Sequence, residues 1–255
     1  MNKTMDFIRR HKGGPFYVDL WPQDTHTPHT PDPELLPKYP GTPKEHQNFN
    51  AVLDEYDRQI GRLLDFLKAE GLDEQTMVVF TADNGPESSF QRQRSGGLRG
   101  MKWSLYEGGV REPFIVRWPG RVPAGQTDTA TISVAVDLFP SICSLVGVPA
   151  PGAFEFDGRD MSAAWLGRPQ VRSAPLFWEY GRNAHFLFPK EPDAKSPNVA
   201  LRDGQWKLLL NADGSETQLY DLAADPKETT NVAEQHPEVA KRLSEQALKW
   251  RKSLP

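Results

Sequence analysis

An amphipathic helical repeat followed directly by a short apolar run constrains the fold more than any other feature. Apolar residues recur at three- and four-residue steps over Leu53–Leu67, which predicts a helix that ends near Gly71. The next run, Met77–Thr81 (MVVFT), predicts a buried strand, as does Phe16–Trp21 (FYVDLW) upstream. A strand, a helix and a strand in this order favour a parallel sheet covered by helices, which is an α/β fold.

The pattern changes after Gly152. Before this point, Phe114–Trp118 is typical of a strand and Val136–Val146 of a helix. After it, short apolar runs with glycine-containing turns predict an antiparallel sheet, and Pro237–Leu254 predicts a terminal helix. The predicted strands are Leu176–Tyr180, Asn198–Leu201, Trp206–Leu210 and Gln218–Leu222. We therefore expect an α/β domain over residues 1–150 and a C-terminal antiparallel-sheet subdomain with its helix over residues 151–255.

Composition argues against several classes of partner. The 255 residues carry a net charge of -4, so neither nucleic acid nor an anionic membrane is expected as a partner. No apolar run is long enough to span a membrane, and Met1–Asp6 lacks the pattern of a secretion signal, so we expect a cytoplasmic location. The single cysteine, Cys143, cannot form an intrachain disulfide, and its apolar helical surroundings predict a core thiol rather than a nucleophile.

Polar residues follow the predicted strand Met77–Thr81. Asp83 and Asn84 place a carboxylate and an amide oxygen side by side at the strand end, which suits a hard cation such as calcium or magnesium. Because Asp, Asn and Gly are also turn formers, these three residues taken alone favour a plain turn. Lys102 lies close to a glycine-rich segment, where a lysine either meets an anion as a point charge or is simply solvated.

A proline-rich loop after the first predicted strand carries Asp24, His26 and His29. A histidine at such a strand end can protonate a leaving group, and two histidines with an aspartate can hold a transition metal. Two solvated loop histidines explain the spacing equally well. Together with a cation site and Lys102, however, the loop would suit hydrolysis of an anionic ester, because the positive groups neutralise its charge.

Five stretches, in this order along the chain, resemble the type I sulfatases (arylsulfatases) of the alkaline phosphatase superfamily. They are PFYVDLWPQDTHTPH, TMVVFTADNG, GMKWSLYEGGVREPFIVRWPG, DLFPSICSLVGVP and LYDLAADPKETTNVA. The resemblance runs from about Met5 to the end of the chain and covers only the C-terminal part of that family. It implies a truncated alkaline-phosphatase-like α/β sheet with flanking helices, plus a small C-terminal antiparallel sheet and helix.

Site residues follow from the resemblance by position. Asp83 and Asn84 match the family's later pair of calcium ligands, and Lys102 matches a lysine that contacts the sulfate and the leaving oxygen. His26 matches the histidine on the leaving-group side. The stretch Glu107–Arg111 matches a structural turn that positions the lysine. His29 has no counterpart in the family pattern.

The sequence also departs from the family pattern. Family members use a formylglycine made from Cys or Ser in C-x-P-S-R or S-x-P-S-R, and neither motif occurs here. The family's first pair of aspartate ligands is also absent from this sequence. We therefore expect no formylglycine, weaker calcium binding, and a sheet with an open edge that a homodimer covers.

Three functions remain open at this point. The first is a sulfatase-family hydrolase that acts on small sulfate or phosphate esters by a metal-assisted route without formylglycine. The second is a phosphodiester or phosphotriester hydrolase in which Asp83, Asn84, His26 and Asp24 hold a metal, zinc if the histidines ligate. The third is a non-catalytic remnant or subunit.

Substrate contacts are the least constrained prediction. Lys102, His29 and His185 are the candidates, and His185 lies in the loop Gly181–Pro197 beside Arg182 and two phenylalanines. This loop either lines the entrance to a site that takes an aryl or sugar group, or packs as an ordinary surface loop.

Overall fold

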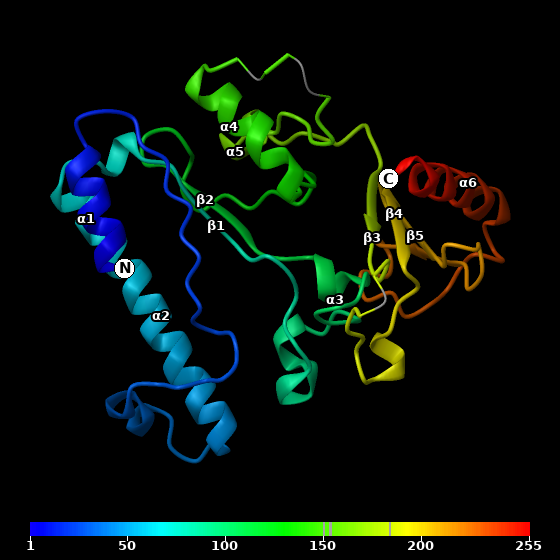
Figure 1. Ribbon diagram of the computed structural model, residues 1–255, viewed down its shortest axis with the longest axis horizontal. Coiled ribbons are helices and arrows are strands. Elements are labelled where there is room, and N and C mark those ends of the chain that lie inside the picture. The colour runs from blue at the N-terminus through cyan, green and yellow to red at the C-terminus, as the bar shows by residue number, and fades with distance from the viewer. Residues whose placement is uncertain (150, 153–154, 184) are drawn as a thin grey trace. The chain divides into compact units, whose positions relative to one another are not determined.

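A computed structural model describes residues 1–149, 151–152, 155–183 and 185–255 (Figure 1). The α-helices are α1 (Asn2–His11), α2 (Lys44–Ala69), α3 (Glu107–Val110), α4 (Leu138–Val146), α5 (Ser162–Trp165) and α6 (Pro237–Ser253). The strands are β1 (Val78–Thr81), β2 (Phe114–Arg117), β3 (Leu176–Glu179), β4 (Val199–Asp203), β5 (Trp206–Leu210) and β6 (Gln218–Asp221). Short 3-10 helices are η1 (Pro33–Lys38), η2 (Asp73–Gln75), η3 (Ser89–Ser95), η4 (Ala135–Asp137) and η5 (Pro192–Ala194).

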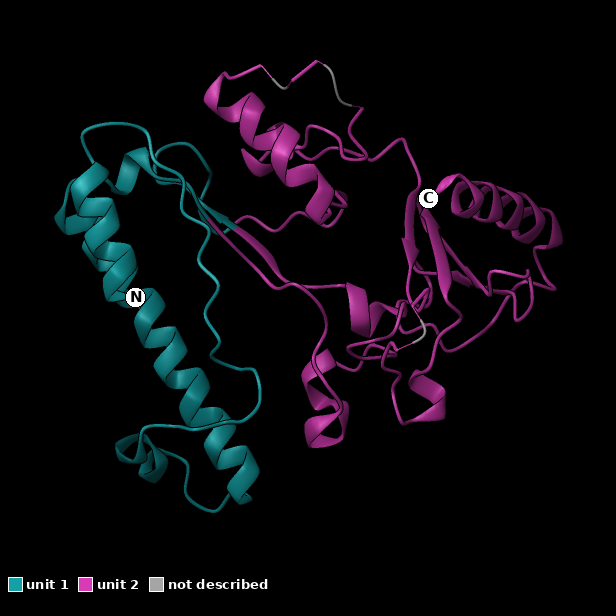
Figure 2. Ribbon diagram, viewed as in Figure 1, with its two compact units in different colours: residues 1–78, 116–125 teal, residues 79–115, 126–255 magenta. Residues whose placement is uncertain are grey.

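The chain divides into two compact units (Figure 2). The first unit comprises residues 1–78 and 116–125, and the second comprises residues 79–115 and 126–255. The predicted domain boundary falls at Ala150, which lies outside the described residues, so that division stays a prediction.

The core of the first unit forms where α1 packs beside the end of α2. Ile8, Leu67 and Leu72 are buried there, with Phe16 and Val18 packed against them. Because α1 is basic in its last turn, Arg9 and Lys12 reach Glu70 at 3.1 and 2.7 Å. The predicted helix is confirmed, and at 26 residues α2 begins earlier than its apolar repeat indicated.

The predicted strand Phe16–Trp21 does not form. The segment belongs to no strand of the structure, so the predicted parallel strand–helix–strand arrangement is wrong for the described residues. Its side chains still alternate, since Phe16 and Val18 pack into the core while Tyr17 and Trp21 are 66% and 83% exposed. The segment is therefore half exposed rather than buried, and it lacks the neighbour with which a strand forms hydrogen bonds. The strand β1 pairs instead with β2.

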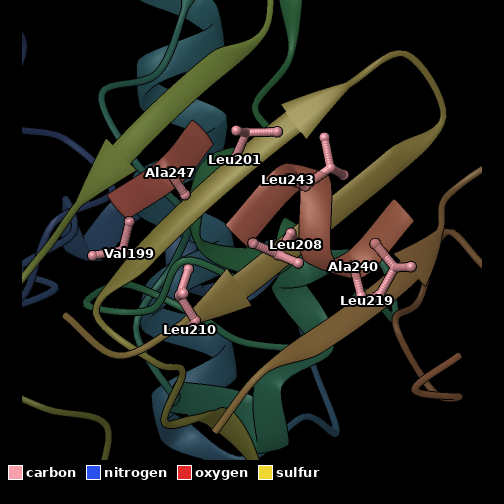
Figure 3. Packing of buried hydrophobic residues seen from close by; sticks show 8 residues of the cluster. All are labelled: Val199, Leu201, Leu208, Leu210, Leu219, Ala240, Leu243 and Ala247. Atoms are coloured by element: carbon pink, nitrogen blue, oxygen red, sulfur yellow. The ribbon is translucent and has the colours of Figure 1, made fainter. Parts of the chain in front are cut away.

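The C-terminal sheet and its helix are confirmed. The strand order is β3-β4-β5-β6, antiparallel throughout, with Leu208 opposite Leu201 on β4 and Leu219 on β6. Alternate residues of these strands face α6, whose buried positions recur at three- and four-residue steps (Figure 3). The buried cluster on this face contains Val199, Leu201, Leu208, Leu210, Leu219, Ala240, Leu243 and Ala247. The opposite face buries Ala200, Leu209 and Tyr220 against Leu105 and Tyr106.

A buried ion pair organises the segment around α4. Arg172 donates to both carboxylate oxygens of Asp137 at 2.8 and 2.9 Å, and Asp137 is fully buried. The same carboxylate accepts the backbone N–H groups of Val134 and Arg159 at 2.9 and 2.8 Å. Cys143 on α4 is buried, as expected for a core thiol. Within the described ranges, no helix is both long and apolar enough to cross a membrane.

Arg172→Leu tests this ion pair. Removing the guanidinium leaves the Asp137 carboxylate buried without its charge partner, so the free energy of unfolding should fall by about 3–5 kcal/mol. Arg168→Leu is the matched control, because Arg168 is exposed, and it should change stability by less than about 0.5 kcal/mol. Chemical denaturation of both variants measures the difference. Equal stabilities would contradict the assignment.

Candidate functional site

Three segments of the second unit meet in one tightly bonded turn region, here called the glycine corner (residues 83–86, 99–102 and 104–109). Gly85 donates its N–H to the Gly109 carbonyl at 2.9 Å, and Lys102 donates its N–H to the Pro86 carbonyl at 2.8 Å. Gly108 donates to the Arg99 carbonyl at 2.6 Å. These bonds bring the turn that follows β1 beside the segment that carries Lys102.

Close backbone packing explains why the corner needs glycine. A Cβ added at Gly85 would lie 2.0 Å from the Gly108 carbonyl oxygen, and one at Gly109 would lie 2.1 Å from the Ser104 carbonyl oxygen. At Gly108 the Arg99 oxygen would lie 2.6 Å away, and Gly100 adopts a φ of +87°. A side chain at Gly85, Gly108 or Gly109 would be too close to these backbone oxygens. The spacing of the glycines therefore fixes the shape of the corner.

Asp83 and Asn84 lie at the exposed edge of the corner. The Asp83 side chain is exposed and Asn84 is half-buried. The amide nitrogen of Asn84 donates to the Gly85 carbonyl at 2.9 Å. An aspartate oxygen and an amide oxygen in this arrangement fit part of the ligand set of calcium.

A second carboxyl, that of Glu112, lies near Asp83. Burial and the negative charge of Asp83 raise the pKa of Glu112 to about 7. A bound cation would relieve this repulsion, so the charge pattern fits the proposed ligands. Sequence reasoning missed Glu112, although it stands in the REP stretch after the glycines. Within the part of the chain that the structure describes, no three or more His, Cys, Asp or Glu side chains form a group able to hold a metal ion.

Lys102 is half-buried, with its ammonium 5.9 Å from the centre of the Trp103 ring. Trp103 adopts a φ of +73°, a conformation that a bulky residue avoids unless its surroundings enforce it. Strain of this kind gathers at functional sites, and here it lies directly beside the lysine.

Behind the corner, a buried cluster of charges joins α3 to the C-terminal sheet. The Lys207 ammonium lies 2.9 Å from a Glu107 carboxylate oxygen and 3.0 Å from a Glu228 carboxylate oxygen. The other Glu228 oxygen accepts the backbone N–H of Glu107 at 2.6 Å. We call these three residues the buried triad. Arg202 and Arg111 lie 3.7 and 3.8 Å from Glu107.

The two carboxyls of the triad titrate differently. Burial favours the neutral form of Glu107, but the nearby charges of Lys207, Arg202 and Arg111 outweigh it and hold its pKa below the usual value. Burial raises the pKa of Glu228, and Lys207 offsets only part of that effect. Glu107 therefore has a greater tendency than Glu228 to be ionised.

Arg99 fastens the corner to the same sheet. Its guanidinium donates to the Tyr220 hydroxyl at 2.9 Å and to the Glu228 carbonyl at 3.0 Å. It also stacks over the Tyr106 ring at 3.9 Å. Tyr106 is buried, which raises its pKa to about 12, and its hydroxyl donates to Gln218 at 2.8 Å.

A cavity of about 350 Å³ adjoins the corner in the second unit. Pro86 and Gly108 form the side it shares with the corner, and Arg94, Arg111 and Glu112 line it further out. Arg94 donates to the Ser89 hydroxyl at 2.5 Å and stacks over the Phe90 ring at 5.3 Å. Two guanidinium groups give the cavity the character of a site for an anionic group.

The remaining predicted site residues lie elsewhere along the chain. Asp24, His26 and His29 belong to the first unit, so the predicted metal set of Asp83, Asn84, His26 and Asp24 draws on both units. His26 is exposed, with Nδ1 2.7 Å from the Thr27 carbonyl, and His29 lies edge-on to Phe49. His185 is exposed in the loop between β3 and β4. In that loop Phe186 packs on Phe188 and Tyr180, as in an ordinary packed surface loop.

Family comparisons agree with this geometry. The sulfatase family model matches residues 1–148, and the model of the N-sulphoglucosamine sulphohydrolase C-terminal region matches residues 101–253. The chain therefore belongs to the sulfatase family, as the sequence predicted.

Individual relatives point the same way. The chain is 32% identical to an N-acetylgalactosamine-6-O-sulfatase of Bacteroides thetaiotaomicron, over 96% of this chain and 48% of that protein. It is 34% identical to human arylsulfatase A, over 77% of this chain and 42% of that protein. The chain thus spans about half the length of the curated relatives it matches.

Solved structures confirm the fold class. A Bacteroides thetaiotaomicron structure from work on the metabolism of multiple glycosaminoglycans superposes with a TM-score of 0.80 at 30% identity, over 99% of this chain and 53% of that chain. The structure of Ps i-CgsB in complex with k-i-k-neocarrahexaose gives 0.82 at 25% identity, over 98% and 53%. The truncated alkaline-phosphatase-like α/β sheet with a C-terminal antiparallel sheet and helix is therefore the correct fold class.

Gly109→Ala tests the packing of the corner. The added methyl would lie 2.1 Å from a backbone oxygen, so the variant should lose about 1–3 kcal/mol of folding free energy. Gly61→Ala is the matched control, because Gly61 lies within α2 with open space around its Cα. That variant should gain about 0.5–1 kcal/mol. Thermal unfolding measures both, and a destabilisation of the same size at each position would refute the packing argument.

Proposed function

We propose that this chain contributes one side of a sulfate-ester hydrolase site, with the glycine corner as its catalytic wall. The observation that carries the proposal is the bond from the Lys102 backbone N–H to the Pro86 carbonyl, which holds the backbone of Lys102 beside the Asp83-Asn84 turn in a chain of the sulfatase family. A cation beside oxygen ligands suits an anionic ester, whose negative charge shifts onto the leaving oxygen in the transition state, better than it suits a neutral substrate.

Each residue has a distinct proposed role. The Lys102 ammonium stabilises negative charge on the sulfate oxygens and on the oxygen that leaves. Asp83 and the Asn84 amide oxygen would hold calcium, and the ion would supply positive charge against the anionic ester. The family resemblance gives His26, which lies in the first unit, the role of an acid toward the leaving oxygen, and this role stays a prediction.

Among the residues of this chain, the attacking group is proposed to be water. The single cysteine of the given sequence, Cys143, is buried in α4 and is therefore not offered as the nucleophile. In this route the water oxygen forms a bond to sulfur and gives up one proton to solvent. The bond from sulfur to the leaving oxygen breaks, and the alcohol leaves after its oxygen takes up a proton.

Sulfated sugars are the proposed substrate class. Support comes from the relatives, since two of them are N-acetylgalactosamine-6-sulfatases by name, from Bacteroides thetaiotaomicron and from dog. The cavity lined by Arg94 and Arg111 adds a place for a further anionic group of such a sugar beside the corner.

Lys102→Ala tests the proposed function. With calcium present, the variant should hydrolyse aryl sulfate and N-acetylgalactosamine 6-sulfate about 100-fold more slowly than the parent chain, because one charge-stabilising group is lost. Asp83→Ala should require more calcium for the same rate. Lys241→Ala is the control, since Lys241 is exposed on α6.

A panel of phosphate mono-, di- and triesters, measured after chelation and then with calcium or zinc added back, separates the alternatives. Zinc-dependent turnover of diesters or triesters without sulfate-ester turnover would favour the phosphoester hydrolase. A folded parent chain that neither hydrolyses any ester nor binds inorganic sulfate would leave only the non-catalytic alternative.

Self-association is a further part of the proposal. Large apolar side chains are exposed in both units, among them Trp21 at 83% and Val171 at 82%. A homodimer would bury such surface, so sedimentation at micromolar concentration should give twice the 28.7 kDa chain mass. Sedimentation as a monomer would refute this part without affecting the ester assay.

A further inference from the structure

We propose that Lys207 and Glu228 are positioning residues: through Glu107 they hold the glycine corner, and with it Lys102, in place. The catalytic consequence rests on the proposed function, whereas the positioning itself does not. Both residues belong to the C-terminal sheet region, away from the predicted site residues in the sequence, and no part of the proposed reaction uses them directly.

The placement of Lys207 is the first argument. Lys207, the second residue of β5, is fully buried, with Arg202 opposite on β4 and Tyr220 opposite on β6. A buried ammonium loses its hydration, and an apolar side chain of similar size often serves stability equally well or better. A lysine at this position is therefore better explained by what it contacts than by the stability of the sheet.

The contacts of Lys207 form a closed ring, which is the second argument. The ammonium joins the Glu107 and Glu228 carboxylates at 2.9 and 3.0 Å. Glu228 in turn accepts the Glu107 N–H at 2.6 Å. Glu107 is thus held at both its backbone and its side chain, so α3 cannot rotate or shift without breaking a buried ion pair.

The path from Glu107 to Lys102 is the third argument. Gly108 and Gly109 follow Glu107 directly, and Gly109 accepts the N–H of Gly85 at 2.9 Å. Pro86, which follows Gly85 in the sequence, accepts the N–H of Lys102 at 2.8 Å. These glycines already pack closely against neighbouring backbone atoms. A displacement of Glu107 would therefore also displace the backbone of Lys102.

A charge-balanced double variant, Lys207→Met with Glu228→Gln, provides the test. It removes one positive and one negative charge together, and Glu107 keeps Arg202 and Arg111 nearby. Leu208→Ala is the matched control. Leu208 neighbours Lys207 on β5 and is equally buried, but it faces α6 rather than the corner.

Residue-resolved amide hydrogen exchange is the measurement, supported by titration with inorganic sulfate. In the double variant, exchange at Gly85, Lys102 and Gly108 should accelerate about tenfold or more relative to the amides of β5 and β6. Sulfate affinity should fall with it. In Leu208→Ala, corner and sheet amides should shift together, and sulfate affinity should stay at the parent value.

The outcomes separate the two proposals. Corner amides that accelerate selectively in a chain that never binds sulfate would support the positioning and overturn the proposed function. Corner and sheet amides that accelerate equally in the double variant would overturn the positioning. If the double variant does not fold, Glu228→Gln alone keeps an acceptor oxygen for the Glu107 N–H. It should still speed exchange selectively at the corner, and the absence of that selectivity would equally overturn the positioning.

Discussion

The Lys207 ammonium, enclosed between the carboxylates of Glu107 and Glu228, is the interaction on which the second unit depends. The three charged groups are buried and have lost their water, and the ion pairs of Lys207 with both carboxylates replace part of it. Glu107 also has Arg202 and Arg111 nearby, whereas Lys207 pairs with the two carboxylates of the triad. These contacts join three segments that are distant in the sequence: a turn near residue 107, a strand near residue 207 and a loop near residue 228.

The glycine corner connects the position of Glu107 to the position of Lys102. An ion pair can hold Glu107, but it fixes Lys102 only if the segments between them cannot flex. Gly85, Gly108 and Gly109 supply that stiffness because each lies in contact with a neighbouring backbone atom that no Cβ would tolerate. Arg99 adds a second attachment through the Tyr220 hydroxyl and the Glu228 carbonyl.

Sequence patterns predicted those parts of the molecule that are specified locally. The strands from Leu176 to Asp221 and the helix α6 follow from short apolar runs, glycine turns and helical spacing, all of which act between near neighbours. The prediction for Phe16–Trp21 failed because a run of strand-forming residues does not show whether a partner strand is available. The candidate residues Asp83, Asn84 and Lys102 were found from motif and resemblance. The roles of Glu112, Lys207 and Glu228 were not, since a charged residue in a sequence does not reveal which distant charge will meet it.

Stability and positioning use opposite faces of the same sheet. One face packs Leu201, Leu208 and Leu219 against α6, and apolar burial of this kind supplies folding free energy without fixing a unique atom-to-atom register (Figure 3). The other face carries Lys207 toward the corner, where hydrogen bonds and ion pairs demand specific distances. An apolar contact tolerates a shift of a few tenths of an ångström, whereas the proposed contact of Lys102 with a sulfate oxygen would not. The burial of a costly charge behind Lys102, rather than another leucine, follows from that difference in tolerance.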